Sequence, residues 1–525
     1  MTGAPSDLTV YGALRLIEDQ DPVHTAVVYK DRRWTYRQLR SEVDRIAGAL
    51  LARGVVRGDR VAMLCSTRIE YWTTFLATSA IGAIWVGLGL RNKLDELSFV
   101  VGDAEPRLLI SLSEFEGRDY RDDLRAIRDI TASIADVVTI DGGFDGSLSW
   151  EDFLEHGGSA AAVNDAALLV DPDDPAIIVY TSGTTGRPKG ALLSHYGLVA
   201  GSRAQMERSA AARPVQINSF PINHIACVGD ISLTNMVAGG TTILAERFDP
   251  REQLEIIERE RVTVWGGIPA MVQMTLAVPD FDRFDLSSLK AVGWGGGAMP
   301  RDVIERLSTL APRVGGLYGL TETTSNVTWT DAGAPLDVLV STIGKPGSAF
   351  PCRVVTEDRH LCGVGEVGEI QFKAETNMLG YWKQPDATRE AFTEDGWLRT
   401  GDLGIWREDG NLTLVGRRIE MYKSGGFNIY PREVEIALES HAAVEAAAVV
   451  PKADRLYNEV GHAFVMLRGD TRPTAHELDV FLRTKLANYK IPKTIQIVDA
   501  LPILANGKID KVALRKDAAA GEGPA

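Results

Sequence analysis

Cysteine and clustered histidine are scarce in this chain. Its four cysteines, Cys65, Cys227, Cys352 and Cys362, form no Cys-x-x-Cys pair in 525 residues. This usage is typical of a reduced protein with structural thiols, and we expect a cytoplasmic location. None of the eight histidines lies in a His-Glu-x-x-His or mixed Cys/His array, so we expect no transition-metal site built from protein ligands alone.

Long apolar runs and an excess of positive charge are also missing. The most apolar stretch, residues 74–90, is interrupted by three glycines and is typical of a buried helix followed by a strand. Residues 1–7 lack the basic start and apolar centre of a secretory signal. Lys and Arg number 56 against 71 Asp and Glu, a net charge of −15, which argues against nucleic acid or an anionic membrane as partner. We expect a monomer or homodimer acting on small molecules.

What the sequence does contain is a hydroxyl- and glycine-rich segment at residues 180–190, YTSGTTGRPKG. It holds four Ser and Thr hydroxyls, three glycines and one lysine, and no acidic side chain. Glycine lets backbone N–H groups approach a ligand, hydroxyls donate hydrogen bonds, and Lys189 adds a mobile positive charge. Because strand-like apolar stretches flank the segment, we predict a polyphosphate-binding loop between two strands. The predicted phosphate-binding residues are Thr181, Ser182, Gly183, Thr184, Thr185, Gly186 and Lys189.

Two other interpretations of this segment are weaker. A flexible surface loop would explain neither the lysine nor the apolar strands at both ends. The Walker phosphate loop is absent, since Lys189 follows Gly186 by three residues rather than directly following a glycine.

The length and the pattern of apolar residues predict more than one domain. A chain of 525 residues is too long for one core. From residue 25 to about 330, helical periodicity alternates with short apolar strands, which is typical of parallel sheets covered by helices. We therefore predict an α/β fold. Its N-terminal domain, residues 1–418, has mostly parallel sheets and a β-rich subdomain at about 340–416; residues 419–525 form a small, mobile α+β domain.

Five further segments follow the loop in a fixed order. They are residues 221–224 (PINH), 295–300 (GGGAMP), 318–322 (YGLTE), 397–402 (WLRTGD) and 502–509 (PILANGKI). With the loop, they resemble the motifs of the adenylate-forming superfamily of acyl-CoA synthetases, carrier-linked adenylation domains and firefly-type luciferases. The resemblance extends from about residue 20 to Arg515, and it is greatest to acyl-CoA synthetases.

The resemblance implies roles for residues of the ATP site. Lys508 would be catalytic, bridging the incoming carboxylate and the α-phosphate, and Thr321 would contact the α-phosphate. Glu322 would hold Mg²⁺. The residues implied to bind adenine and ribose are Gly296, Gly297, Ala298, Tyr318, Gly319, Asp402 and Arg417.

The resemblance also places an acyl pocket and a CoA tunnel. His224 is implied as a catalytic pocket residue, and Trp294 either lines the pocket or packs in the core. The implied acyl-pocket residues are His224, Cys227, Val228, Trp294, Gly295, Gly296 and Thr323. The implied tunnel residues are Lys423, Ser424, Gly425 and Gly426. Glycines and the lack of Arg or Lys in the pocket stretches predict a medium-to-large, mainly apolar monocarboxylate, aliphatic or ring-containing.

The hinge between the domains departs from the family pattern. That pattern is Gly-Arg-x followed by Asp or Lys, whereas here Ile419 occupies the pivot position and Glu420 follows it. We still expect rotation of the C-terminal domain, since a hinge depends more on compliant backbone than on one side chain.

These motifs predict an AMP-forming acid–CoA ligase that uses ATP, Mg²⁺ and CoA. The carboxylate would react with ATP to give acyl-AMP and pyrophosphate, and the CoA thiol would then displace AMP. Alternatives are a stand-alone adenylating enzyme that loads a separate carrier protein, or a luciferase-like oxygenase. A nucleotide-binding protein without catalysis is disfavoured, because Lys189, Glu322, Asp402, Arg417 and Lys508 are all present.

Overall fold

The computed structural model describes residues 6–155, 157–181, 187–208, 211–424, 427–469, 471–503 and 509–520. Several predicted site residues lie outside these ranges, namely residues 182–186, Gly425, Gly426 and Lys508. The side chain of the predicted hinge residue Ile419 also lies outside the described part.

The chain divides into two compact units. The first comprises Met1–Pro351 and Phe372–Leu398, and the second comprises Cys352–Gln371 and Arg399–Ala525. Most strands of the predicted β-rich subdomain, at about residues 340–416, therefore belong to the second unit together with the C-terminal residues. The predicted boundary between residues 418 and 419 concerns the part that rotates, and it stays a prediction.

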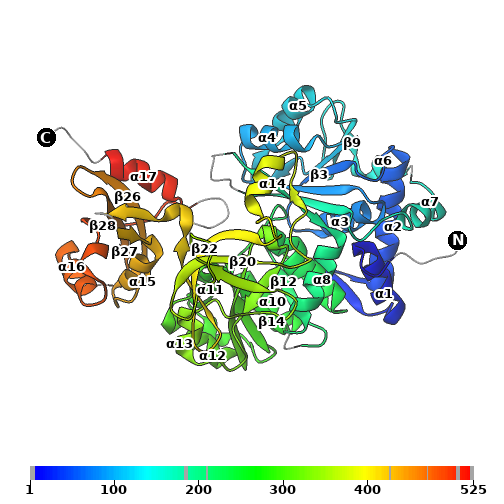
Figure 1. The fold of residues 1–525 in the computed structure, drawn as a ribbon. Coiled ribbons are helices and arrows are strands. Elements are labelled where there is room, and N and C mark those ends of the chain that lie inside the picture. The colour runs from blue at the N-terminus through cyan, green and yellow to red at the C-terminus, as the bar shows by residue number, and fades with distance from the viewer. Residues whose placement is uncertain are drawn as a thin grey trace. The chain divides into compact units, whose positions relative to one another are not determined.

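Two helix-covered sheets form the centre of the first unit (Figure 1). The larger has the order β18 (Lys345–Pro346), β17 (Asn326–Trp329), β16 (Arg313–Gly319), β15 (Ala291–Trp294), β14 (Val264–Gly267), β12 (Val215–Asn218), β13 (Thr241–Leu244), β1 (Thr25–Tyr29), β2 (Arg32–Thr35). The smaller has the order β21 (Gly380–Tyr381), β11 (Lys189–Ser194), β10 (Pro175–Thr181), β4 (Ile84–Leu88), β3 (Arg60–Leu64), β5 (Leu108–Ser111), β8 (Asp136–Thr139), β9 (Leu148–Ser149). Parallel pairs fill the middle of both sheets. Antiparallel pairs lie at both edges of the larger sheet and at the β21 edge of the smaller one, whose other edge is the parallel pair β8–β9. The predicted mostly parallel, helix-covered sheets are confirmed.

The helices of the first unit connect these strands. They are α1 (Val10–Gln20), α2 (Tyr36–Ala52), α3 (Ile69–Ala80), α4 (Leu94–Ala104), α5 (Arg121–Ile130), α6 (Trp150–Glu155), α7 (Ala160–Ala167), α8 (His195–Met206), α9 (Thr234–Val237), α10 (Pro250–Glu260), α11 (Pro269–Leu276), α12 (Arg301–Leu310), α13 (Leu336–Ser341) and α14 (Pro385–Ala391). A π-helix, η1 (Ala226–Leu233), precedes α9, and short 3-10 turns are η2 (Phe281–Arg283) and η3 (Thr321–Thr323). A small separate hairpin pairs β6 (Glu114–Phe115) with β7 (Arg118–Asp119).

Local sequence explains where two of these helices form. In α2, the apolar residues Leu39, Val43 and Ile46 recur at helical spacing and are completely buried, which is how an amphipathic helix covers a core. Helix α10 begins where the Asp249 carboxylate accepts hydrogen bonds from the N–H groups of Arg251 and Glu252, at 3.0 and 2.9 Å. Pro250 then occupies the first turn, where its missing N–H costs nothing.

The apolar stretch at residues 74–90 forms the end of α3 and the strand β4, as predicted. Both elements are buried in the first unit. In the part of the chain that the structure describes, no helix combines the length and apolar character needed to cross a membrane.

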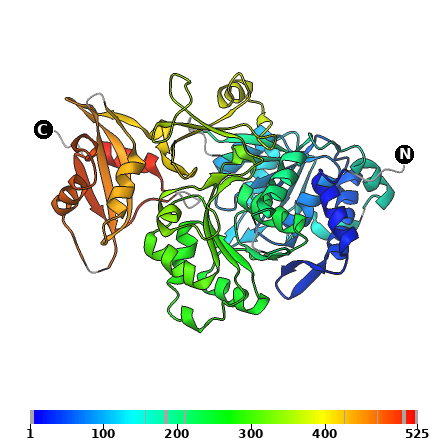
Figure 2. The same ribbon diagram turned by 60° about the horizontal axis from the view of Figure 1, so that its bottom comes forward.

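The second unit contains two sheets of its own. One has the order β19 (Cys352–Val355), β20 (Val367–Phe372), β22 (Leu398–Trp406), β23 (Leu412–Arg417). The other has the order β25 (Phe427–Ile429), β24 (Tyr422–Ser424), β27 (Asn458–Leu467), β26 (Val444–Asp454), with β28 (Thr494–Val498) parallel to β27. Its helices and turns are η4 (Arg418–Glu420), α15 (Pro431–Glu439), α16 (Ala475–Arg483), η5 (Asn488–Lys490) and α17 (Lys511–Ala520). Helices α15 and α17 pack on β26 (Figure 2).

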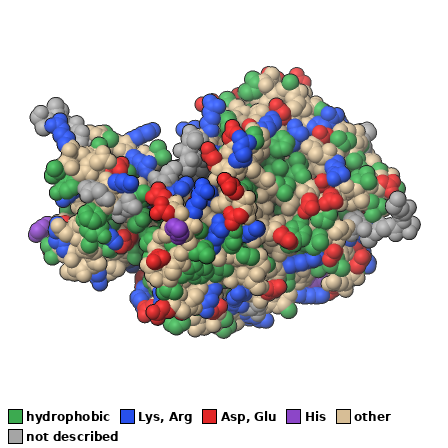
Figure 3. All heavy atoms as spheres, in the orientation of Figure 1, with side chains coloured by type: hydrophobic (Ala, Val, Ile, Leu, Met, Phe, Trp, Pro, Cys, Tyr) green, Lys and Arg blue, Asp and Glu red, His purple; other side chains and the backbone are tan. Residues whose placement is uncertain are grey.

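The surface carries charges of both signs. Acidic and basic side chains are interspersed over the face shown in Figure 3.

Candidate active site

The predicted phosphate loop starts and ends on paired strands. Strands β10 and β11 run antiparallel, and Thr181 faces Lys189 directly across the pair. The Thr181 hydroxyl donates to the Lys189 carbonyl at 3.4 Å. The predicted loop between two strands is therefore confirmed at both of its ends, while residues 182–186 lie outside the described part.

Lys189 and Glu322 are brought together by a residue that the sequence analysis missed. Tyr381 lies on β21, which pairs with β11 so that Tyr381 faces Ala191. Its hydroxyl donates to Glu322 Oε1 at 2.9 Å, and Lys189 Nζ lies 5.2 Å from its ring centroid. One tyrosine thus contacts both the lysine proposed for the phosphates and the carboxylate proposed for the metal. Glu322 is also held by its backbone, because its carbonyl accepts from Met378 N–H at 2.8 Å.

The turn that carries Thr321 and Glu322 is fixed from within. Thr323 is fully buried, and its hydroxyl lies 2.9 Å from the carbonyl oxygens of both Leu320 and Ser325. The same oxygen accepts from Leu320 N–H at 2.8 Å. Thr323 therefore holds the shape of the turn η3. Its predicted contact with the acyl group stays a prediction.

The predicted adenine-binding residues lie at the carboxyl ends of adjacent parallel strands. Strands β15 and β16 pair with Trp294 facing Gly316, so residues 295–298 follow the end of β15 next to the last part of β16, where Tyr318 pairs with Thr328 of β17. Gly296, Gly297 and Ala298 are exposed, and Gly296 has φ +78°, a conformation that favours glycine. A ligand crevice at the carboxyl edge of a parallel sheet is the usual arrangement in α/β folds.

The predicted acyl-pocket residues differ in exposure. His224 is exposed, and its Nδ1 accepts from Ala226 N–H at 3.4 Å. Cys227 and Val228 are fully buried in the core, and Trp294 is 4% exposed. Burial raises the pKa of the Cys227 thiol to about 11, so this thiol stays protonated at neutral pH and is a poor nucleophile. The membership of these residues in the pocket stays a prediction.

A hydrogen-bonded polar cluster lies close in sequence to the predicted acyl-pocket residues Val228 and Thr323. Asp230 of η1 accepts a hydrogen bond from Gln205 Nε2 of α8 at 3.1 Å, and Gln205 Oε1 accepts from Asn326 Nδ2 of β17 at 2.9 Å. Burial of the Asp230 carboxyl raises its pKa to about 7. Polar side chains thus lie next to predicted pocket residues in the chain, although the sequence predicted a mainly apolar acid as substrate.

The predicted ribose-binding pair is formed within the second unit. Asp402 of β22 faces Arg417 of β23 across an antiparallel pair, and Arg417 Nε lies 3.0 Å from Asp402 Oδ1. The Asp402 side chain is 4% exposed while that of Arg417 is 46% exposed. The buried carboxylate is therefore paired with a guanidinium that is half-exposed. Contact with a ribose stays a prediction.

Glu420, next to the pivot position, is tied to the helix that follows Lys508. Lys511, the first residue of α17, forms ion pairs with Glu420 and, at 2.8 Å, with Glu435. Burial acts to lower the pKa of Lys511, but attraction to Glu435 and Glu420 outweighs it and raises that pKa. Arg432 also pairs with Glu435, at 3.3 Å. The hinge segment η4 and the start of α17 are thus joined.

The residues on either side of the Lys508 segment are paired with each other. Ile503 and Ile509 form an antiparallel bridge, and Asp510 N–H donates to the Pro502 carbonyl at 2.8 Å. Lys508 itself lies outside the described residues.

Comparison with known proteins decides the family. The model of the AMP-binding enzyme family matches residues 17–382, and that of the AMP-binding enzyme C-terminal domain matches residues 433–508. This chain belongs to the AMP-binding enzyme family. Feruloyl-CoA synthase of an Amycolatopsis species is 34% identical over 499 residues, 94% of this chain and 96% of the relative. Indoleacetate–CoA ligase of Aromatoleum aromaticum is 33% identical over 501 residues, 94% of this chain and 95% of the relative.

A solved structure of an AMP-binding enzyme agrees in fold. ATP-bound MatB from Rhodopseudomonas palustris superimposes with a TM-score of 0.86 at 28% identity, covering 97% of this chain and 99% of that one. The predicted superfamily and fold class are confirmed. So are the predicted class of enzyme, an AMP-forming acid–thiol ligase, and the binding of ATP.

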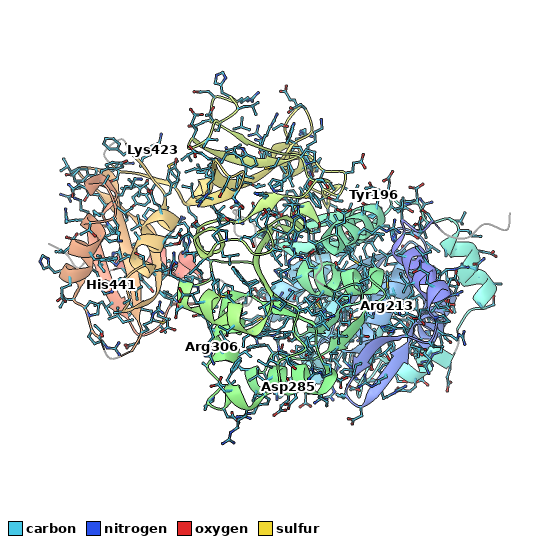
Figure 4. The ribbon with its side chains drawn as sticks, turned by 90° about the horizontal axis from the view of Figure 1, so that it is seen from below. Tyr196, Arg213, Asp285, Arg306, Lys423 and His441 are labelled. Carbon is cyan, nitrogen blue, oxygen red and sulfur yellow. The ribbon has the colours of Figure 1, made fainter. Side chains whose placement is uncertain are left out.

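Replacing Tyr381 with phenylalanine tests the link between Lys189 and Glu322. Tyr381→Phe removes the hydrogen bond to the Glu322 carboxylate, and we expect kcat/KM for ATP–pyrophosphate exchange to fall about tenfold. The Mg²⁺ concentration for half-maximal exchange should rise as well. Tyr196→Phe is the matched control, since Tyr196 donates to Glu375 at 2.7 Å on the surface (Figure 4). Equal rates in Tyr381→Phe and wild type would contradict a role for this hydroxyl.

The Lys511 network predicts a pH-dependent contribution to stability. Lys511→Met leaves Glu435 with one cation fewer, and we expect the free energy of unfolding to fall by about 1–3 kcal/mol at pH 7.5. The folded-state pKa of Lys511 is raised, so this contribution is constant below about pH 10.4, the usual lysine pKa, and is lost as pH rises through the folded pKa. Denaturant unfolding at pH 7.5 and pH 11, with exposed Lys516→Met as control, measures both effects. An equal loss at both pH values would contradict the ion-pair origin.

Proposed function

We propose that this AMP-binding enzyme joins a medium-to-large apolar, aromatic or alicyclic monocarboxylic acid to CoA through an acyl-adenylate. The observation that carries this proposal is the contact of Tyr381 with both Glu322 and Lys189. This contact holds a carboxylate suited to a metal and a cation suited to phosphate at the antiparallel edge of the smaller sheet. The first and second steps of the reaction follow from these groups.

In the first step, an oxygen of the acid attacks the α-phosphorus of ATP. The bond from that phosphorus to the pyrophosphate oxygen breaks, and acyl-AMP and pyrophosphate result. Lys189 holds the β- and γ-phosphates that leave, and Thr321 contacts the α-phosphate. Lys508 stabilises the charge that develops between the carboxylate and the α-phosphate, which is an electrostatic role without proton transfer.

The donor set near Glu322 fits Mg²⁺. Among the described residues, no group of three or more His, Cys, Asp or Glu side chains converges as a metal site. Mg²⁺ in phosphoryl-transfer enzymes is held by one or two carboxylates together with substrate phosphates, so Glu322 alone suffices on the protein side. When bound, Mg²⁺ would supply positive charge to the phosphates. Tyr381 orients the Glu322 carboxylate for this contact.

In the second step, the CoA sulfur attacks the acyl carbonyl carbon. The bond from that carbon to the AMP phosphate oxygen breaks, the thiol proton passes to solvent, and acyl-CoA and AMP are released. Lys423 and Ser424 on β24 are proposed to line the path of the thiol arm. The Arg417–Asp402 pair is proposed to contact the ribose.

Two features support a ring-containing acid. Gly316 faces the Trp294 ring, so that a Cβ there would lie only 3.4 Å from Trp294 Nε1, and relatives are named for feruloyl and indoleacetyl groups. The Asp230–Gln205–Asn326 cluster offers hydrogen bonds to a polar substituent.

A panel of acids measured with and without CoA tests this proposal. We expect CoA-dependent ATP consumption with substituted cinnamic, indoleacetic and medium-chain acids, and at least tenfold lower kcat/KM with acetate. Acetate as the best substrate would refute the roomy pocket. ATP turnover that proceeds without CoA would favour carrier loading or an oxygenase reaction.

Lys508→Ala separates the two half-reactions. Loss of the bridging charge should reduce pyrophosphate exchange by about 100-fold or more, which is the scale for removing one stabilising donor. Thioester formation from supplied acyl-AMP should remain within about threefold of wild type. Lys516→Ala is the control. An equal loss of rate in both half-reactions would contradict the role assigned to Lys508.

A further inference from the structure

The strand that begins with Lys189 lies between two strands that both reach one residue of α4. In the smaller sheet, β11 has β10 on one side and β21 on the other. On the β10 side, the Tyr180 hydroxyl donates to Asp103 Oδ2 at 2.6 Å. On the β21 side, the indole N–H of Trp382, the residue after β21, donates to the Asp103 carbonyl at 3.1 Å. One residue near the end of α4 thus links both sides of β11.

The same two aromatic residues also hold the backbone next to Lys189. Tyr180 pairs with Gly190 across β10 and β11. A Cβ at position 190 would lie 2.6 Å from Ile178 Cγ2 and 3.1 Å from Tyr180 Cζ, so only glycine lets these side chains pack so closely. The backbone N–H of Trp382 donates to the Gly190 carbonyl at 2.7 Å. The position of Lys189 is therefore coupled to both groups that meet at Asp103.

The last turn of α4 is itself held by side-chain donors. The final carbonyls of a helix have no partner within it, and cations are favoured there by the helix dipole. The Asp103 carbonyl also accepts from Lys383 Nζ at 2.8 Å, and the Ala104 carbonyl accepts from Arg60 Nε at 2.8 Å. The end of α4 is thus fixed by β3 and by the segment that leads from β21 to α14 (Figure 1).

The Tyr180 hydroxyl keeps its proton in this setting. Burial and the hydrogen bond to Asp103 raise the pKa of Tyr180, while the charge of Arg60 acts in the opposite direction. The phenol is therefore the donor and the carboxylate the acceptor. Hydrogen bonds from O–H to a carboxylate are shorter and stronger than those between neutral groups.

We propose that Asp103 is a positioning residue for adenylation, which fixes Lys189 for the phosphates of ATP by holding both neighbours of β11. The inference rests on the role proposed for Lys189. Asp103 acts through Tyr180 and Trp382 and not on the reacting atoms. Such support matters because a displacement of about 1 Å in a positioning group can cost roughly 100-fold in rate.

The carbonyl contact of Asp103 reaches the carboxylate proposed for Mg²⁺. Trp382 directly follows Tyr381, whose hydroxyl donates to Glu322 at 2.9 Å. Replacing the Asp103 side chain leaves its carbonyl in place, so the two contacts are separable. Asp103→Ala removes the contact with Tyr180, and Trp382→Phe removes the indole N–H.

Tyr180→Phe and Asp103→Ala, alone and combined, test the side-chain contact. Tyr180→Phe keeps the ring against Gly190 and removes only the hydroxyl, so its fold should persist. We expect each variant to raise KM for ATP in pyrophosphate exchange about tenfold, the scale for a lost hydrogen bond to a charged group. The double variant should add less than about twofold, because both changes remove one interaction. Asp103→Asn, which keeps an acceptor oxygen, should stay within about threefold of wild type.

Two readouts separate positioning from general stability. KM for the acid, and thioester formation from supplied acyl-AMP, should stay within about twofold of wild type, because neither involves the β- and γ-phosphates. Asp44→Ala is the matched control, since the Tyr11 hydroxyl donates to Asp44 Oδ1 at 2.5 Å between α1 and α2. It removes the same kind of hydrogen bond, and KM for ATP should not change. Trp382→Phe should raise the Mg²⁺ concentration for half-maximal exchange about threefold or more.

Several results would overturn the positioning role of Asp103. These are an unchanged KM for ATP in Tyr180→Phe and Asp103→Ala, additive losses in the double variant, equal losses in both half-reactions, or an Asp44→Ala effect as large as that of Asp103→Ala. An unchanged Mg²⁺ requirement in Trp382→Phe would overturn the link to Glu322. A wild-type protein that formed no acyl-AMP from any acid would instead refute the proposed function.

Discussion

Repulsion between a carboxylate and a triphosphate is the constraint on which the arrangement of this protein depends. Two like unit charges 4 Å apart repel by about 4 kcal/mol at an effective dielectric constant of 20, and the chain as a whole carries a net charge of −15. Attraction therefore has to be local. In the first unit it is provided where β11 and β21 pair, because Lys189 begins β11 and Tyr381 orients Glu322 beside it. In the proposed mechanism, this cation and this carboxylate, through its metal ion, would act on the same phosphates.

Each unit prepares its own part of the chemistry. The first fixes the Thr321–Glu322 turn through buried Thr323, and it exposes bare backbone at Gly296 and Gly297 after the end of β15. The second pairs Asp402 with Arg417 and joins the hinge segment to α17 through Lys511 and Glu420. Groups fixed before the substrates bind lose little freedom in the transition state, which is how preorganised sites gain rate. The assigned steps need little more than placement and charge from the protein.

Sequence reasoning succeeded where the informative residues are contiguous in the chain. The hydroxyl- and glycine-rich segment, the YGLTE motif and the alternation of strands and helices were all local patterns, and they led to the family and the fold. Tyr381 was missed because its partners are remote, with Glu322 lying 59 residues earlier in the chain. Nothing around Gly380–Tyr381 marks it as part of a site until β21 pairs with β11. The burial of Cys227 and Val228 could not be read from the sequence either, since an apolar residue that lines a pocket and one that packs in the core look the same there.

The sequence by itself determined the nucleotide, the class of reaction and the parallel-sheet architecture, because ordered motifs and hydrophobic periodicity are properties of the chain. Tertiary structure alone decided which distant groups touch: Tyr381 with Glu322 and Lys189, Lys511 with Glu420, Tyr180 with Asp103. The physical reason is that strand pairing and helix packing bring residues together at distances that no local pattern encodes. The sequence names the charged groups. The fold determines which of them lie together.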